Sequence, residues 1–215
     1  MKKNYYILGC GGFAKEVYFL SNQILKNENY QFKGFIDYKP IITYIEACKN
    51  KLPVIDEDYF LNNVLPNDET LIFMGVGEPK LIEKLSLKFA NYNFPNLIHN
   101  NFIGDINSIE IGKGNIITAG CVFTVDIKIG SFNIFNLNVT VGHDTKILNN
   151  NVFNPGCNVS GSVSVGSNNL FGTNSTILQQ ISIENNNIIG ASSLINKNVD
   201  NDKIMVGVPA KALNK

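Results

Sequence analysis

The C-terminal part of this 215-residue chain repeats with a period of six residues. When every sixth residue is taken from Ile111 to Ile195, all fifteen positions hold isoleucine, valine or phenylalanine. One apolar residue per six predicts short parallel strands that wind into a β-helix, because single coils cannot bury an apolar face alone and must stack. A β-sandwich has no reason to keep this period, so the repeat strongly disfavours it.

A second period of 18 residues predicts the size of a coil. Three six-residue repeats make one coil, so five coils are expected from about Ile111 to Asp200. We expect the residues of the second period to stack at one corner, to adopt the left-handed conformation that a sharp corner needs, and to hydrogen-bond along the axis. They are Asn115, Asn133, Asn151, Asn169 and Asn187.

The sequence before residue 95 alternates apolar runs with helical spacing. Strands are expected at residues 5–8, 32–37 and 71–77, and helices at residues 13–25 and 79–90. Strand and helix in alternation predict a small α/β domain with a parallel sheet. We therefore expect a Rossmann-like α/β domain over residues 1–95, followed by a β-helix over residues 96–215.

The composition of the chain limits the kinds of molecule and compartment in which it can act. The 18 basic and 18 acidic residues balance, and no basic stripe points to a nucleic-acid partner. No stretch approaches the roughly 18 apolar residues of a membrane span, and the apolar run near the N-terminus is short for a signal peptide. The four cysteines form no CxxC pair, which is typical of reduced thiols in a cytoplasmic protein.

Two sites can be expected from the residues themselves. The turn Gly9-x-Gly11-Gly12 follows a strand and precedes a helix, an arrangement that binds a diphosphate, either of a dinucleotide such as NAD or of a nucleotide sugar. In the coils, His143 is the single histidine and a candidate general base. Gly161 lies one coil further on, and its missing side chain is expected to leave room above the imidazole for a thioester.

Four segments together carry a family resemblance: Ile7–Val17, Val141–Asp144, Ile189–Leu194 and Val206–Lys211. With them the chain resembles the hexapeptide-repeat sugar acetyltransferases of bacterial glycan synthesis. These include the sialic acid O-acetyltransferase type and the bacillosamine and perosamine N-acetyltransferase type. The resemblance implies a homotrimer of left-handed β-helices, each with an N-terminal Rossmann-like domain. It also implies acetyl-CoA as co-substrate in the groove between neighbouring helices, without a metal.

The resemblance assigns roles to individual residues. His143 would be the general base, Asp144 would orient it, and Asn136 would lie near the acceptor. The residues expected to bind acetyl-CoA are Gly161, Thr173, Gly190, Ala191 and, near a phosphate, Lys211. The residues expected to bind a nucleotide sugar are Gly9, Gly11, Gly12, Phe13, Asp37, Gly75 and Gly77. Phe13 departs from the family, where several members carry histidine, and this puts the identity of the sugar in doubt.

The leading hypothesis is N-acetylation of a nucleotide-linked 4-amino-4,6-dideoxy sugar. The alternative is O-acetylation of sialic acid or a related free sugar, which would not need a diphosphate-binding turn. A β-helical carbonic anhydrase is excluded, because its zinc site needs three histidines and the chain has two. An ice-binding β-helix would carry columns of threonine on a flat face, and the sequence shows none.

Overall fold

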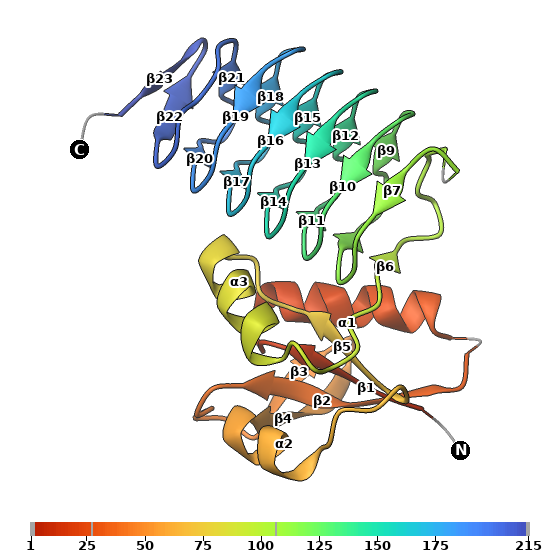
Figure 1. Cartoon of the computed structure of the whole chain (residues 1–215). Helices are drawn as coiled ribbons and strands as arrows, with labels where there is room; N and C mark the ends of the chain where they lie inside the picture. The colour runs from red at the N-terminus through yellow and green to blue at the C-terminus, as the bar shows by residue number, and fades with distance from the viewer. Residues whose placement is uncertain (1–2, 27, 106, 214–215) are drawn as a thin grey trace.

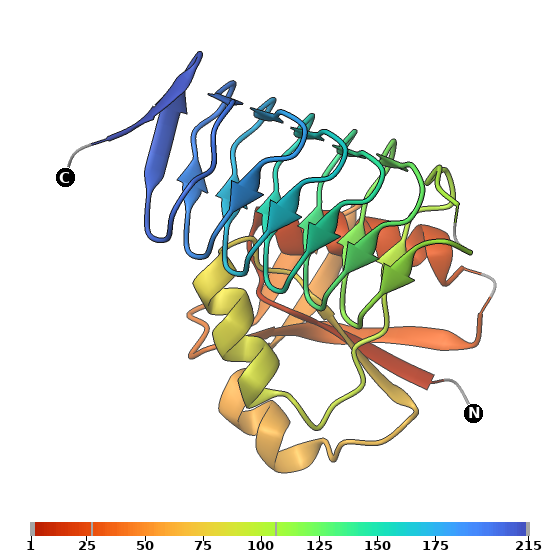
Figure 2. The same ribbon diagram turned by 45° about the horizontal axis from the view of Figure 1, so that its top comes forward.

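The computed structural model describes residues 3–26, 28–105 and 107–213. An α/β domain packs against one side of a column of stacked coils (Figure 1). Seen from a second direction, the coils form successive layers of one solenoid (Figure 2).

The α/β domain contains a five-stranded sheet in the order β3-β4-β2-β1-β5. Four strands are parallel, and β3 is antiparallel to β4. Their bounds are β1 (Lys3–Leu8), β2 (Tyr30–Asp37), β3 (Tyr44–Ala47), β4 (Asn50–Asp56) and β5 (Thr70–Met74). The three strands expected from the sequence are confirmed. The β3–β4 hairpin was not expected, because its alternating pattern is short and its central strand contains Pro53.

Three helices complete this domain: α1 (Gly12–Ile24), α2 (Glu57–Asn63) and α3 (Pro79–Lys88). Helix α1 lies between the sheet and the coils, and α2 covers the opposite side of the sheet (Figure 1). Helix α2 ends near the chain that follows α3, since the ring of Phe60 contacts those of Phe89 and Tyr92. Both expected helices are confirmed, and α2 is an addition.

The coils form three sheets, here called faces 1, 2 and 3 in the order in which the chain visits them. Their strands are parallel except β23, which pairs antiparallel with β22. Face 1 contains β7 (Glu110–Ile111), β10 (Lys128–Ile129), β13 (Lys146–Ile147), β16 (Ser164–Val165) and β19 (Ser182–Ile183). Face 2 contains β6 (Leu97–Ile98), β8 (Ile116–Ile117), β11 (Ile134–Phe135), β14 (Val152–Phe153), β17 (Leu170–Phe171), β20 (Ile188–Ile189), β22 (Ile204–Gly207) and β23 (Ala210–Ala212). Face 3 contains β9 (Val122–Phe123), β12 (Thr140–Val141), β15 (Asn158–Val159), β18 (Thr176–Ile177) and β21 (Leu194–Ile195).

The predicted apolar column fills the interior of the coils. From β7 to β21, strands pair in register 18 residues apart, so equivalent positions stack, as in Phe135 on Phe153. The rings of Phe135, Phe153 and Phe171 are parallel, with centroids 4.8 Å and 4.5 Å apart. Each phenylalanine fully buried in this way stabilises the folded chain by about 1.5–3 kcal/mol.

The asparagines of the 18-residue period form a buried ladder, as predicted. Oδ1 of Asn133 accepts hydrogen bonds from the backbone N and the side-chain Nδ2 of Asn151, at 2.9 Å and 3.0 Å. Oδ1 of Asn151 accepts from Asn169 in the same way. The expected left-handed backbone was wrong for these residues, because the residue before each ladder position adopts it, for example Phe132 and Asn150. The preceding residue makes the turn, and the side chain of each of these ladder asparagines accepts a hydrogen bond from a backbone N–H group of the next coil.

The hydrophobic core of the α/β domain extends onto the outer surface of the coils. The outward side chains of face 2 in the first coils, Ile116, Ile134 and Val152, pack into the core of the α/β domain. At the adjacent corner, the ring of Phe132 meets that of Phe94 edge-on at 5.1 Å. Strand β6 begins just after the predicted domain boundary at residues 95 and 96, which itself stays a prediction. No helix among the described residues is long and apolar enough to cross a membrane.

Candidate active site

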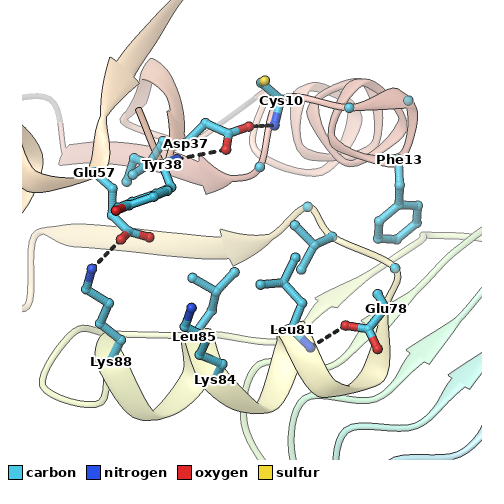
Figure 3. Close-up of a pocket in the computed structure, with 17 residues that line it drawn as sticks. Cys10, Phe13, Asp37, Tyr38, Glu57, Glu78, Leu81, Lys84, Leu85 and Lys88 are labelled. Atoms are coloured by element: carbon cyan, nitrogen blue, oxygen red, sulfur yellow. Dashed lines mark hydrogen bonds and ion pairs between the residues drawn. The ribbon is translucent and has the colours of Figure 1, made fainter. Parts of the chain in front are cut away.

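A cleft of about 770 Å³ opens at the carboxyl ends of the parallel strands of the α/β domain (Figure 3). The chain crosses from β1 to β2 on the α1 side of the sheet and from β4 to β5 on the α2 side, so the cleft lies where the crossovers change sides. Open α/β sheets bind ligands at such positions. The cleft is lined by all seven residues predicted to bind a nucleotide sugar: Gly9, Gly11, Gly12, Phe13, Asp37, Gly75 and Gly77.

Three of these glycines face open space. A Cβ added at Gly11, Gly12 or Gly77 would meet no atom within 4 Å beyond its chain neighbours. The other two are needed by the fold. Gly9 has a φ of +92°, and a Cβ at Gly75 would lie 2.5 Å from Cγ2 of Ile7. Packing therefore explains Gly9 and Gly75, whereas the other three leave the backbone accessible to a ligand.

The first turn of α1 presents free backbone N–H groups to the cleft. Its N-cap is Gly11, which has no side chain to accept them, and the turn contains no acidic residue. Helix α3 differs, because the carboxylate of its N-cap, Glu78, accepts hydrogen bonds from the N–H groups of Lys80 and Leu81. Unpaired N–H groups and the positive end of the helix dipole favour an anion at the start of α1.

Asp37 ties the end of β2 to the turn after β1. Its Oδ2 accepts a hydrogen bond from the backbone N of Cys10 at 3.1 Å, and its Oδ1 accepts one from the N of Tyr38 at 2.8 Å. Burial and the neighbouring carboxylate raise the pKa of the Cys10 thiol to about 12. The thiol therefore stays protonated near neutral pH, which argues against a nucleophilic role. The predicted contact of Asp37 with a ribose or base stays a prediction.

Five polar residues of the cleft were missed from the sequence: Tyr38, Glu57, Glu78, Lys84 and Lys88. Buried Glu57, at the start of α2, forms an ion pair with Lys88 of α3. Lys84 lies one turn before Lys88 and forms no ion pair within the described part of the chain. The four-residue spacing of the lysines in a predicted helix was a usable signal, because such residues share a helix face. Nothing marked Glu57, since no helix is predicted around it.

His143 and Asp144 form a dyad at the corner between faces 3 and 1. Nδ1 of His143 lies 2.7 Å from Oδ2 of Asp144, and both side chains are exposed. Asp144 has a φ of +58°, and this left-handed corner conformation accompanies the contact with the adjacent imidazole. Because an ionised carboxylate only accepts, Nδ1 carries the hydrogen and Nε2 of the neutral ring keeps its lone pair. This geometry suits a general base whose orientation is held by Asp144.

Gly161 has a different reason to be glycine than the one expected. A Cβ at this position would lie 2.5 Å from Nε2 of His143. The imidazole itself therefore occupies the space above Gly161. The His143 side chain stays exposed, and the room expected for a thioester beside it stays a prediction. Gly161 allows the ring to lie against the next coil, which holds Nε2 in place.

Other residues expected at the acetyl-CoA site lie elsewhere in the same chain. Asn136 belongs to the corner between faces 2 and 3, in the same 18-residue column as Gly190, and Thr173 and Ala191 follow that column by one residue. Thr173 and Ala191 are exposed. Lys211 is exposed on β23, which continues face 2. Within one chain, these residues are on a different corner from the dyad.

Packing between successive coils explains why two positions at this corner hold glycine. A Cβ at Gly172 would lie 2.4 Å from the backbone N of Ala191, and one at Gly190 would lie 2.9 Å from Cγ1 of Val206. Their predicted role beside pantetheine stays a prediction.

The cleft and the dyad are also separate within one chain. None of the described coil residues lines the cleft, and the α/β domain packs on face 2, whereas the dyad lies at the corner where faces 3 and 1 meet. Within residues 3–26, 28–105 and 107–213, no group of three or more His, Cys, Asp or Glu side chains is placed to hold a metal ion.

Residues 4–89 match the PglD N-terminal domain family. A comparison with curated proteins finds no sequence match. The agreement with this family covers the α/β domain, including the glycine turn, Asp37 and the residues of the cleft.

The whole chain shares its fold with solved structures. A mutant of perosamine N-acetyltransferase from Caulobacter crescentus, in complex with CoA and GDP-perosamine, is 23% identical with a TM-score of 0.84, covering 99% of this chain and 97% of that one. The acetyltransferase domain of PglB from Neisseria gonorrhoeae, in complex with acetyl coenzyme A, is 23% identical with a TM-score of 0.87, covering 99% and 100%. WeeI from Acinetobacter baumannii is 24% identical with a TM-score of 0.83, covering 97% and 99%.

These comparisons confirm the predicted fold class, a Rossmann-like α/β domain followed by a left-handed parallel β-helix. They also confirm the predicted resemblance to hexapeptide-repeat sugar acetyltransferases, in sequence for the α/β domain and in fold for the whole chain.

Proposed function

We propose that the chain is an acetyltransferase that moves the acetyl group of acetyl-CoA to the amino group of a nucleotide-linked 4-amino-4,6-dideoxy sugar, in the synthesis of a bacterial surface glycan. The observation that carries the proposal is the presence, in one chain, of an anion-binding cleft and of a His143–Asp144 dyad. A diphosphate suits the free N–H groups of α1, and an acyl transfer needs a base such as His143.

The dyad supplies the proton chemistry. Nε2 of His143 takes a proton from the sugar amine as the amine nitrogen attacks the thioester carbonyl carbon. The carbon–sulfur bond then breaks, and the proton on Nε2 passes to the departing CoA sulfur. Asp144 stabilises the imidazolium that exists between these steps. Backbone N–H groups of the coils are the donors available for the tetrahedral oxyanion.

A homotrimer explains why the site residues occupy different corners. The corner with His143 and the corner with Thr173 and Ala191 can form one site if they belong to neighbouring copies. The same packing brings the cleft of one chain to the dyad of another. The resemblance to trimeric enzymes, in which acetyl-CoA lies between neighbouring helices, supports this arrangement. The four free cysteines agree with the proposed cytoplasmic location.

Similar structures support a nucleotide sugar over a dinucleotide. The perosamine N-acetyltransferase that shares this fold is described in complex with CoA and GDP-perosamine, and the PglB domain with acetyl coenzyme A. The glycine turn likewise favours a diphosphate-linked sugar over free sialic acid.

The test is an incubation of the protein with acetyl-CoA and each of several UDP-, GDP- and dTDP-linked 4-amino-4,6-dideoxy sugars, with free sialic acid alongside. Release of CoA is followed with a thiol reagent, and the product is identified by mass spectrometry. Release with one amino sugar nucleotide is expected, with none for the 4-hydroxy analogue. Release with sialic acid alone would replace this proposal by O-acetylation. The oligomeric state is measured by light scattering, and a monomer would contradict the shared site.

A further inference from the structure

The cleft has two chemically different ends. In Figure 3, Phe13 and Glu78 lie at one end, and Tyr38, Glu57 and Lys88 lie at the other. Glu78 also lines a smaller groove with Asn168 and Leu170 of the coils, so the Phe13 end opens toward the β-helix. The second end points away from the coils and holds a buried charge whose purpose the proposed reaction leaves unexplained.

Glu57 is unusual in this position because its side chain is only 7% exposed. One oxygen, Oε1, accepts from the ammonium of Lys88. The second oxygen, Oε2, makes no hydrogen bond within the described residues, and it points into the cleft (Figure 3). An ionised carboxylate oxygen accepts hydrogen bonds, and Glu57 lines the cleft, so Oε2 is available to a ligand that supplies an N–H.

Lys88 and Tyr38 complete this end. The hydrogen bond with Glu57 raises the pKa of the Lys88 ammonium, so it stays charged. Its side chain is 35% exposed, and an ammonium has three N–H donors, of which Glu57 takes one. Tyr38 is 59% exposed and lines the cleft, so its ring offers a flat surface on which a base can stack.

The order of ligand groups along the cleft follows from the proposed function, on which this inference rests. The sugar must lie at the Phe13 end, because acetyl transfer takes place at the coils. The diphosphate then lies at the free N–H groups of α1, near the middle. The nucleoside is left with the end formed by Tyr38, Glu57 and Lys88.

We propose that Tyr38, Glu57 and Lys88 form the nucleobase subsite, and that it selects bases with a ring N–H beside a carbonyl oxygen, namely guanine, uracil and thymine. The ring N–H donates to Oε2 of Glu57, and the adjacent carbonyl oxygen accepts from Lys88. Adenine and cytosine carry a bare ring nitrogen and an amino group at these places. In the same pose, a lone pair would face the carboxylate and an N–H would face the ammonium, so both contacts become repulsive.

Binding of nucleoside diphosphates alone tests the proposal without acetyl transfer. UDP, GDP, dTDP, CDP and ADP are titrated into the full-length protein by calorimetry. We expect the best of UDP, GDP and dTDP to bind at least about tenfold more tightly than CDP and ADP, because two hydrogen bonds are exchanged for two repulsive contacts. Equal affinities for all five would overturn the base selection.

Two variants separate base recognition from a structural ion pair. Glu57→Gln presents both a donor and an acceptor, so we expect the preference to shrink to within about threefold, because an amide can turn to suit either kind of base. Lys84→Met is the matched control, since Lys84 lies on the same helix and lines the cleft. It should weaken all five ligands to the same extent. If the base preference is unchanged in Glu57→Gln, the ion pair between Glu57 and Lys88 contributes only to the stability of the fold.

A third variant keeps the test decisive if Glu57→Gln does not fold. Tyr38→Leu changes an exposed side chain and should leave the melting temperature unchanged. We expect it to weaken the preferred nucleoside diphosphate at least about fivefold and to leave the binding of inorganic pyrophosphate unchanged. Equal weakening of both would place the base elsewhere. Failure of the wild-type protein to bind any of the five would instead contradict the nucleotide cleft of the proposed function.

Discussion

Two glycines of the cleft and two glycines of the coils have opposite surroundings. Gly11 and Gly77 face open space, and no neighbouring atom prevents a side chain there. Gly142 and Gly172 in the coils are enclosed, since a Cβ would lie 2.5 Å and 2.4 Å from the backbone of the next coil. The coils therefore constrain their sequence through packing, whereas the open glycines of the cleft have no such constraint and suit the approach of a ligand.

Glu57 of the cleft differs in a similar way from two asparagines of the ladder. Asn133 and Asn151 are fully buried in the coils, and their side chains are satisfied by the chain itself. Glu57 is also buried, but one of its oxygens has no partner within the described residues. Substitutions in the coils should therefore alter stability, and substitutions in the cleft should alter ligand binding. The dyad is the exception, because it lies on the coils and is exposed.

The largest effect is expected from Asn151→Ala. This change removes the acceptor for the backbone N and Nδ2 of Asn169 and a donor to the carbonyl of Gly166. Buried groups left unpaired cost about 1–3 kcal/mol each, so the free energy of unfolding should fall by roughly 3–5 kcal/mol. Urea denaturation measures it. The control is Asn158→Ala on the exposed side of face 3, which should change stability by less than about 0.5 kcal/mol. Similar values for both variants would mean that the ladder is not a source of stability.

The second-largest effect is expected from His143→Ala. Although this residue lies on the coils, the change should lower activity and leave stability unchanged. Its side chain is exposed, so the melting temperature should stay that of the wild type. Turnover should fall at least ~100-fold, because the amine loses its base. The second histidine provides the control, since His99→Ala should leave turnover unchanged. Activity near that of the wild type in His143→Ala would remove the dyad from the mechanism.

Gly11→Val and Gly75→Ala compare an open glycine with an enclosed one inside the same cleft. Gly11→Val should raise the KM for the nucleotide sugar by about tenfold at constant stability, because a side chain would cover the N-terminus of α1. The KM for acetyl-CoA should not change. Gly75→Ala should lower the free energy of unfolding by about 1–3 kcal/mol, because its Cβ would overlap with Ile7. Loss of stability in Gly11→Val would show that the turn is structural.

The smallest effect concerns the thiol of the cleft. Burial is the main cause of the raised pKa of Cys10, and the hydrogen bond and charge of Asp37 add to it. Asp37→Asn removes the negative charge, so the pKa should fall but stay above its ordinary value. Alkylation of Cys10 at fixed pH should then become a few times faster, because the thiolate is the reactive form. Peptide mapping after iodoacetamide treatment measures the rate, with exposed Cys48 as the internal reference. An unchanged rate would mean that burial alone sets the reactivity.

The sequence predicted the coils more completely than it predicted the α/β domain. In the coils, the positions of the six-residue period from Ile117 to Ile195 were predicted and are all buried, because each coil repeats the same local geometry. The sequence did not predict five further residues of this core in the same range, namely Cys121, Ile127, Val139, Cys157 and Val163. In the α/β domain, the glycine turn and the strand ends were predicted from local signals. Helix α2 was missed, and with it Glu57, because α2 is only seven residues long.

The sequence by itself determined the β-helix, its coil length, the asparagine ladder and the glycine turn of the cleft, because a fixed period and short motifs encode local geometry. The tertiary structure alone decided which of these residues meet. It placed Glu57 against Lys88, two residues 31 positions apart. It placed the ring of His143 over Gly161, and it separated the dyad from the cleft by packing the α/β domain on face 2. These relations depend on contacts between distant segments and on the buried surface that joins them, and no local pattern records either.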